Sequence, residues 1–156
     1  MNMMKKLVYG AAMLAALVLN ARADGVMFVK ADATGSGDGS SWANAYTDFN
    51  AALAAAVASG GTVSEIWLKG DFEASAAPSA VTISDNLCIR GGFAGTETAA
   101  GERAAGALSV FSGNDTYNIM EVNVAVGKTL SFERVVFTRA YNCALKKTGT
   151  GSLVIT

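Results

Sequence analysis

The sequence contains no histidine, only two cysteines and a single proline, Pro78, among its 156 residues. Without histidine, Ser-His-Asp and Cys-His catalysis and histidine-based zinc binding are excluded. Two cysteines are also too few for a structural zinc site, which needs four ligands. Charged residues are scarce, at 16%, whereas hydrophobic residues make up 51%, so the composition predicts a folded chain rather than a disordered one.

The first 23 residues have the layout of a secretory signal peptide. Lys5 and Lys6 precede an apolar run from Leu7 to Leu19, and NARA, ending at Ala23, matches an A-x-A cleavage site. The run of 13 residues is too short to cross a bilayer, which takes about 20. We therefore predict a signal peptide over residues 1–23 and an exported chain with no membrane span after cleavage. It would be secreted or at the cell surface, in the periplasm or on the outer-membrane exterior of a Gram-negative cell.

Cleavage would leave a mildly acidic chain. It removes Lys5, Lys6 and Arg22 but no acidic residue. The mature chain would keep nine of the 12 basic residues and all 13 acidic residues, which gives it a net charge of −4. This balance gives no electrostatic reason to expect nucleic acid or an anionic membrane as a partner. Export would permit a disulfide between Cys88 and Cys143. Residues on non-adjacent coils would exceed the Cα separation of roughly 7 Å that a disulfide tolerates, which favours two unpaired thiols.

One helix is predicted, over Thr47–Ser59. Thr47 is a suitable N-cap, and Gly60 is a suitable stop. Phe49, Leu53 and Val57 recur at helical spacing and give the helix one apolar face. We expect this helix to cover the end of the remaining structure.

The rest of the mature chain reads as short β-strands. A first strand is predicted over Val26–Asp32, and seven further runs follow Gly61: EIWLKGDF, AVTIS, NLCIRGGF, LSVFSGN, NIMEVNV, TLSFERVVFTRA and SLVIT. Aligning the most apolar runs on Trp67, Cys88, Val110, Val136 and Val154 gives spacings of 21, 22, 26 and 18 residues. This loose period of about twenty is in the range of solenoid coils, with strands stacked in parallel.

The stretch IRGGFAGTET, from Ile89 to Thr98, predicts a sharp corner. Gly91 and Gly92 would turn the chain, Phe93 would point into the core, and Gly95 would begin an external loop. The spacing matches neither GxGxxG nor GxxxxGK, so a phosphate-binding loop is disfavoured.

The strings DATGSGDGSSWANAYTDFNAAL, EIWLKGDF, IRGGFAGTET and SVFSGND, in this order, resemble the opening of bacterial secreted right-handed parallel β-helix proteins of the pectate-lyase-like kind. The resemblance implies an all-β right-handed parallel β-helix, a solenoid with an N-terminal capping α-helix, in which residues 24–156 form the cap and the first rungs. The sequence ends in GSLVIT, which reads as a strand with no cap. We therefore expect a fragment of a longer protein, or an end that another chain covers.

No catalytic, cofactor-binding or metal-binding residue is predicted. Glu121, Glu133, Arg134 and Arg139 are scattered and read as solvated residues between apolar neighbours. Asp32 and Asp38 lack the spacing of an EF-hand and favour turns. Trp42, Tyr46 and Phe49 could form a sugar-stacking platform, but beside a helix they are more typical of the core of a cap.

Two functions are left open. The first is a non-catalytic secreted or cell-surface β-helix scaffold, such as an adhesive protein or a fragment of a larger surface protein. The second is the N-terminal part of a polysaccharide lyase or glycoside hydrolase whose active site lies beyond this chain. A surface glycan or another protein is the expected partner. Self-association through the C-terminal edge, which carries Leu153, Val154 and Ile155, is the other expectation.

Overall fold

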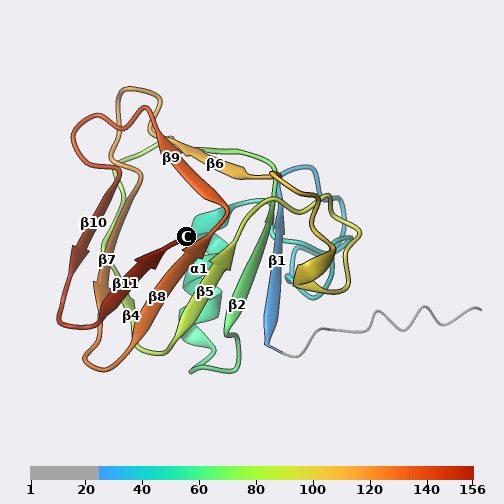
Figure 1. The fold of residues 1–156 in the computed structure, drawn as a ribbon, viewed down its shortest axis with the longest axis horizontal. Helices are drawn as coiled ribbons and strands as arrows, with labels where there is room; N and C mark the ends of the chain where they lie inside the picture. Colours follow the sequence, from blue (N-terminus) through green and yellow to red (C-terminus); the bar gives the residue numbers. More distant parts are fainter. Residues whose placement is uncertain (1–24) are drawn as a thin grey trace, which may run out of the picture.

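The computed structural model describes residues 25–156, whose strands form three separate parallel sheets. The predicted signal peptide lies outside these residues. The largest sheet has five strands, coloured from blue to red in chain order in Figure 1. These strands are β1 (Val26–Lys30), β2 (Glu65–Lys69), β5 (Leu87–Arg90), β8 (Thr129–Glu133) and β11 (Ser152–Ile155), adjacent in that order.

The other two sheets have three strands each. One contains β4 (Val81–Ile83), β7 (Met120–Val124) and β10 (Leu145–Thr148), with β7 in the middle. The other contains β3 (Phe72–Glu73), β6 (Ser109–Ser112) and β9 (Val135–Thr138), with β6 in the middle. Every pair of neighbouring strands is parallel, so the predicted parallel pairing is confirmed.

The helix α1 (Phe49–Ala58) connects β1 to its neighbour β2 and lies behind the five-stranded sheet in Figure 1. Its N-cap is Asp48, whose Oδ1 accepts the N–H of Ala51 at 2.7 Å, and not the predicted Thr47. Phe49 and Leu53 are buried as predicted, while Val57 is only partly buried. A short 3-10 helix, η1 (Ala100–Glu102), was not predicted.

The main core lies between the helix and the three sheets. Inward side chains form ladders across the five-stranded sheet, such as Ile66, Ile89 and Phe132, which are all fully buried. Leu68, Leu87, Ile89 and Phe111 are buried in this core, and Phe137 is partly buried against it.

The predicted all-β right-handed parallel β-helix, a closed solenoid of the pectate-lyase-like kind, is wrong for the described residues. Their strands form three small separate sheets, and no closed solenoid is present among them. The first crossover between neighbouring parallel strands is a helix, as in α/β folds. The arrangement is therefore closer to the α/β type than to an all-β solenoid.

The predicted period placed strands of different sheets in one row. Val110 and Val136 were aligned with Trp67 and Cys88, but they lie in β6 and β9, which belong to another sheet. The register partners of Cys88 are Glu65 of β2 and, across the next interval, Ser131 of β8. Long connections between β5 and β8 separate these partners, and an apolar pattern alone cannot tell which sheet a short strand joins.

Candidate functional site

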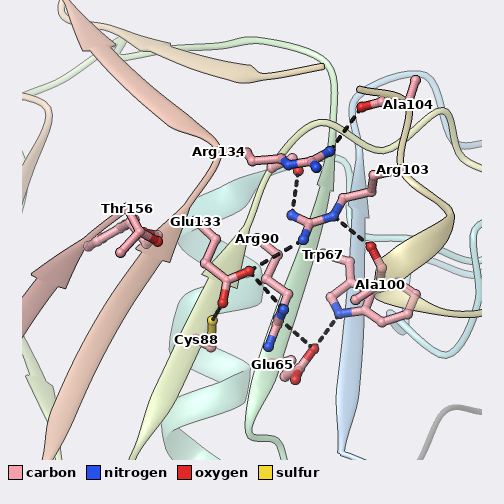
Figure 2. A network of polar contacts seen from close by, with 12 residues as sticks. Glu65, Trp67, Cys88, Arg90, Ala100, Arg103, Ala104, Glu133, Arg134 and Thr156 are labelled. Atoms are coloured by element: carbon pink, nitrogen blue, oxygen red, sulfur yellow. Dashed lines mark hydrogen bonds and ion pairs between the residues drawn. The ribbon is translucent and has the colours of Figure 1, made fainter. Parts of the chain in front are cut away.

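Four charged side chains form an acid–arginine network on the outward face of the five-stranded sheet: Glu65, Arg90, Arg103 and Glu133 (Figure 2). Glu65, Arg90 and Glu133 come from β2, β5 and β8, which are neighbours in the sheet. Parallel register places Arg90 directly beside Glu133. The fourth member, Arg103, is the residue that directly follows η1.

Both carboxylates of this network already have partners. Arg90 Nη1 lies 2.7 Å from Glu133 Oε2, and Arg103 Nη2 lies 3.3 Å from the same oxygen. Arg90 Nε lies 3.0 Å from Glu65 Oε2, but its N–H forms no hydrogen bond, so this contact is an ion pair only. The network therefore joins three strands and one loop, which is a structural role.

Arg103 also attaches a long loop to the sheet. Its Nε donates to the carbonyl of Ala100 at 2.8 Å, and its Nη1 donates to the carbonyl of Gly91 at 3.1 Å. Its guanidinium lies 5.0 Å from the ring centroid of Phe93, within the range of a cation–π contact. Its side chain is only 8% exposed.

Beneath this loop lies an aromatic cluster of Phe28, Trp42, Trp67 and Phe93. Trp67 and Phe93 stack with centroids 4.5 Å apart, and Phe28 meets Trp42 edge to face at 4.8 Å. The rings cover one another instead of facing solvent as a sugar-binding platform would. The prediction that Trp42, Tyr46 and Phe49 share the core of a cap is corrected, because Trp42 joins this outer cluster while Phe49 packs in the main core.

The glycine corner forms as predicted, with one difference. Gly92 and Gly95 have φ of +80° and +93°, and a side chain at Gly91 would collide with the carbonyl oxygen of Arg134. Phe93 is buried, but in the outer aromatic cluster and not in the main core. The backbone N–H groups of residues 94–96 donate to the carboxylate of Glu97 at 2.6, 2.9 and 3.0 Å. The N–H groups of this glycine loop therefore already bind an anion, the carboxylate of Glu97.

The structure separates the other charged residues singled out in the sequence. Glu121 pairs with Lys146, Arg139 pairs with Asp115, and Arg134 donates to the carbonyl of Ala104. Only Glu133 belongs to the acid–arginine network. Asp32 lies within ion-pair distance of Lys30 and Lys69, and Asp38 accepts from the hydroxyl of Ser36 and the N–H of Ser40. Within residues 25–156 no group of three or more acidic or cysteine side chains is placed to hold a metal ion.

The three sheets end together in exposed edge strands. We call β9, β10 and β11 the open end, because each is the last strand of its sheet and, among the described residues, no further strand pairs with it. The rows of apolar side chains that cross the sheets end at these strands. Phe72, Phe111 and Phe137 stack across β3, β6 and β9, with successive centroids 5.2 and 5.7 Å apart. The outer face of Phe137 has no further ring against it in the described chain.

Exposed apolar side chains are concentrated at the open end. Of the six large hydrophobic residues exposed among the described residues, four belong to it or to its connecting loop: Val136, Tyr141, Val154 and Ile155. Ile155 is 54% exposed although its register partner Phe132 is completely buried. Exposed apolar side chains beside unpaired strand edges favour the addition of another strand.

Both cysteines are free thiols, as predicted. Within the described part of the chain, α1 has ten residues and no helix reaches the length and apolar character needed for a membrane crossing. No family model, curated protein or solved structure matched this chain. The geometry of the open end is therefore the main guide to function.

Proposed function

We propose that this protein is an exported, non-catalytic scaffold module that assembles by strand addition at its open end. The observation that carries the proposal is that, among residues 25–156, β9, β10 and β11 each have one unpaired edge, near the exposed side chains of Val136, Val154 and Ile155. Unpaired backbone groups on an edge strand are a template for another strand. The lysine-led apolar segment over residues 1–23 supports export.

Four carboxylates of the described residues are held by partners within the chain, which supports a structural role for them. Glu65 and Glu133 are bound by arginines, and Glu97 is bound by backbone N–H groups. Glu121 is paired with Lys146. These groups stabilise strands and loops, and a general acid or base would instead need access to a substrate proton.

The proposal is tested in cells of the source organism. The chain is recovered after export, its amino terminus is sequenced, and its assembly state is measured by cross-linking before cell disruption. We expect a chain that begins at Asp24 and cross-links to larger species. Val154→Lys should abolish these species, because an edge charge resists pairing. Val126→Lys is the matched control, since Val126 is 78% exposed and lies in a turn outside the open end.

A chain that keeps residues 1–23 and stays inside the cell would contradict export. Equal cross-linking of the wild-type and Val154→Lys chains would contradict assembly through the open end.

A further inference from the structure

A cavity of about 240 Å³ lies between the amino-terminal turn of α1 and strand β3. Its base is apolar, because the buried side chains of Phe49, Phe72, Phe111 and Ile119 line it. The ring centroid of Phe49 lies 4.7 Å from that of Phe111 and 6.2 Å from that of Phe72. The rings of Phe72 and Phe111 stack at 5.2 Å. Pockets for drug-sized ligands have about 300–1,000 Å³, so this cavity suits a smaller molecule of about one ring.

Short side chains leave the space above these rings open. The segment that follows β3 reads ASAAP over residues 74–78, and all five residues line the cavity. An alanine or serine side chain extends at most one heavy atom beyond Cβ, so none of them can fill the space above the rings. The cavity therefore exists in the chain as it stands and does not need a ligand to form it.

The charged residues that line the cavity are all acidic: Asp48, Asp71 and Glu73. All three are exposed, which places them at the mouth, above the buried rings. Asp48 Oδ1 accepts the N–H of Ala51, and Asp71 Oδ1 accepts the N–H of Val110 at 3.0 Å. Each of these two carboxylates keeps a second oxygen. Within residues 25–156 the carboxylate of Glu73 makes no hydrogen bond and no ion pair, unlike those of Glu65, Glu121 and Glu133.

Neither a metal ion nor an anion suits this mouth. In the described part of the chain no group of three or more acidic or cysteine side chains is placed to hold a metal ion. An anion would be repelled by the carboxylates, and Asp48 already caps the first turn of α1, where an anion could otherwise bind. The pKa of Arg139 is raised by Asp115 and more weakly by Glu73, but its guanidinium is bound to Asp115 at 2.7 Å. The charge of the mouth therefore calls for a cation from outside the chain.

We propose that this cavity binds an organic cation, a protonated amine attached to an apolar body of about one ring. The apolar body lies on the phenylalanine rings, where its burial is favourable. The ammonium lies at the mouth beside Glu73, because a carboxylate is a strong acceptor for a charged N–H donor. The inference goes beyond the proposed function and does not rest on the open end, since none of the lining residues belongs to β9, β10 or β11.

The test is a titration of the purified chain with phenethylammonium at neutral pH and low salt, followed by nuclear magnetic resonance. We expect saturable shifts of the ring protons of Phe49, Phe72 and Phe111. Three matched compounds separate the two parts of the ligand: 2-phenylethanol lacks the charge, phenylacetate reverses it, and methylammonium lacks the ring. Each should bind at least about threefold more weakly than phenethylammonium. Added salt should weaken the binding of phenethylammonium but not that of 2-phenylethanol.

Variants at Glu73 assign the charge. Because this side chain is exposed and unpaired within the described chain, changing it should leave the fold intact, as checked by circular dichroism. Glu73→Gln should weaken phenethylammonium by about 3- to 10-fold and leave 2-phenylethanol unchanged. Glu73→Lys should abolish binding of phenethylammonium and permit that of phenylacetate. Glu102→Gln is the matched control, since it removes one negative charge from η1, which does not line the cavity.

Three results would overturn the inference: no ring shifts at millimolar phenethylammonium, equal affinity for phenethylammonium and 2-phenylethanol, or unchanged affinity in Glu73→Gln. Shifts confined to residues outside the cavity would overturn it as well. If a Glu73 variant fails to fold, the comparison of the four compounds on the wild-type chain decides.

Discussion

The indole Nε1 of Trp42 donates to the backbone carbonyl of Glu97 at 3.0 Å and joins two loops that are 55 residues apart in sequence. The carboxylate of Glu97 accepts the N–H groups of its own loop. One residue therefore holds the external loop closed and fixes it over the aromatic cluster. Both tryptophans of the protein, Trp42 and Trp67, lie in that cluster.

The external loop should open in acid. Burial raises the pKa of Glu97. The hydrogen bonds from the backbone N–H groups of residues 94–97 together outweigh this effect, so that the pKa of Glu97 lies below the ordinary 4.5. The stabilisation is therefore complete above the ordinary pKa and is lost as the pH falls below it, toward the lowered folded-state pKa. We expect tryptophan emission to shift to the red in that acid range. In Glu97→Gln this transition should be absent.

Glu121→Gln is the control for this experiment, because Glu121 lies on β7 beside Lys146, outside the aromatic cluster. If Glu97→Gln and the wild type show the same acid transition, Glu97 does not hold the loop.

Leu53 should be essential for folding. Its side chain is 1% exposed in the main core. Losing it costs about 2–5 kcal/mol for the packing alone, and a buried unpaired carboxylate adds to this. Leu53→Asp should therefore unfold the domain, as measured by circular dichroism. Ala54→Asp, on the exposed side of α1, should cost less than about 1 kcal/mol. Equal melting of the two variants would mean that α1 does not pack on the core.

The corner at Gly91 should not accept a side chain. A Cβ there would collide with the backbone carbonyl of Arg134 and lie 2.8 Å from the Cβ of Ser109. Gly91→Ala should lower the free energy of unfolding by roughly 1–3 kcal/mol or more. Gly101→Ala should change it little, because a Cβ there meets nothing within 4 Å. Urea denaturation of both variants measures the difference, and equal midpoints would contradict the corner geometry.

Cys88 should react slowly with alkylating reagents. Burial raises the pKa of its thiol and outweighs the lowering effects of the Ser131 hydrogen bond and of Arg90, while the carboxylates of Glu133 and Glu65 add smaller raising effects. The reactive thiolate is therefore rare at neutral pH. In Cys143→Ser, alkylation at pH 8 should be much slower than for a free thiol, and denaturant should restore the ordinary rate. Fast labelling of the folded chain would show that Cys88 is not shielded.

Local patterns of the sequence predict much of the secondary structure. The apolar spacing of Phe49 and Leu53 predicts the helix, and alternation predicts β2, β5 and β8. The strand β10 is missed, because its sequence LKKT has only one apolar residue and it forms by pairing with β7. Its edge position tolerates the two lysines. Pairing between distant segments is invisible to a local pattern.

The acid–arginine network shows the same limit. The sequence singles out Glu133 but not Glu65 or Arg90, which lie far away along the chain. Their alternation with buried neighbours shows only that they face outward. That they face one another depends on the register of β2, β5 and β8, which no single strand encodes.

Strand order within each sheet follows chain order, from β1 to β11 in the largest sheet and likewise in the two smaller ones. Each strand therefore docks onto one that was made before it, apart from those that begin a sheet. A chain delivered amino terminus first can fold progressively, with each newly placed strand serving as the template for the next. Chains that stop after β5 or β8 should keep their earlier pairings, and errors in the last strands should leave the amino-terminal half intact.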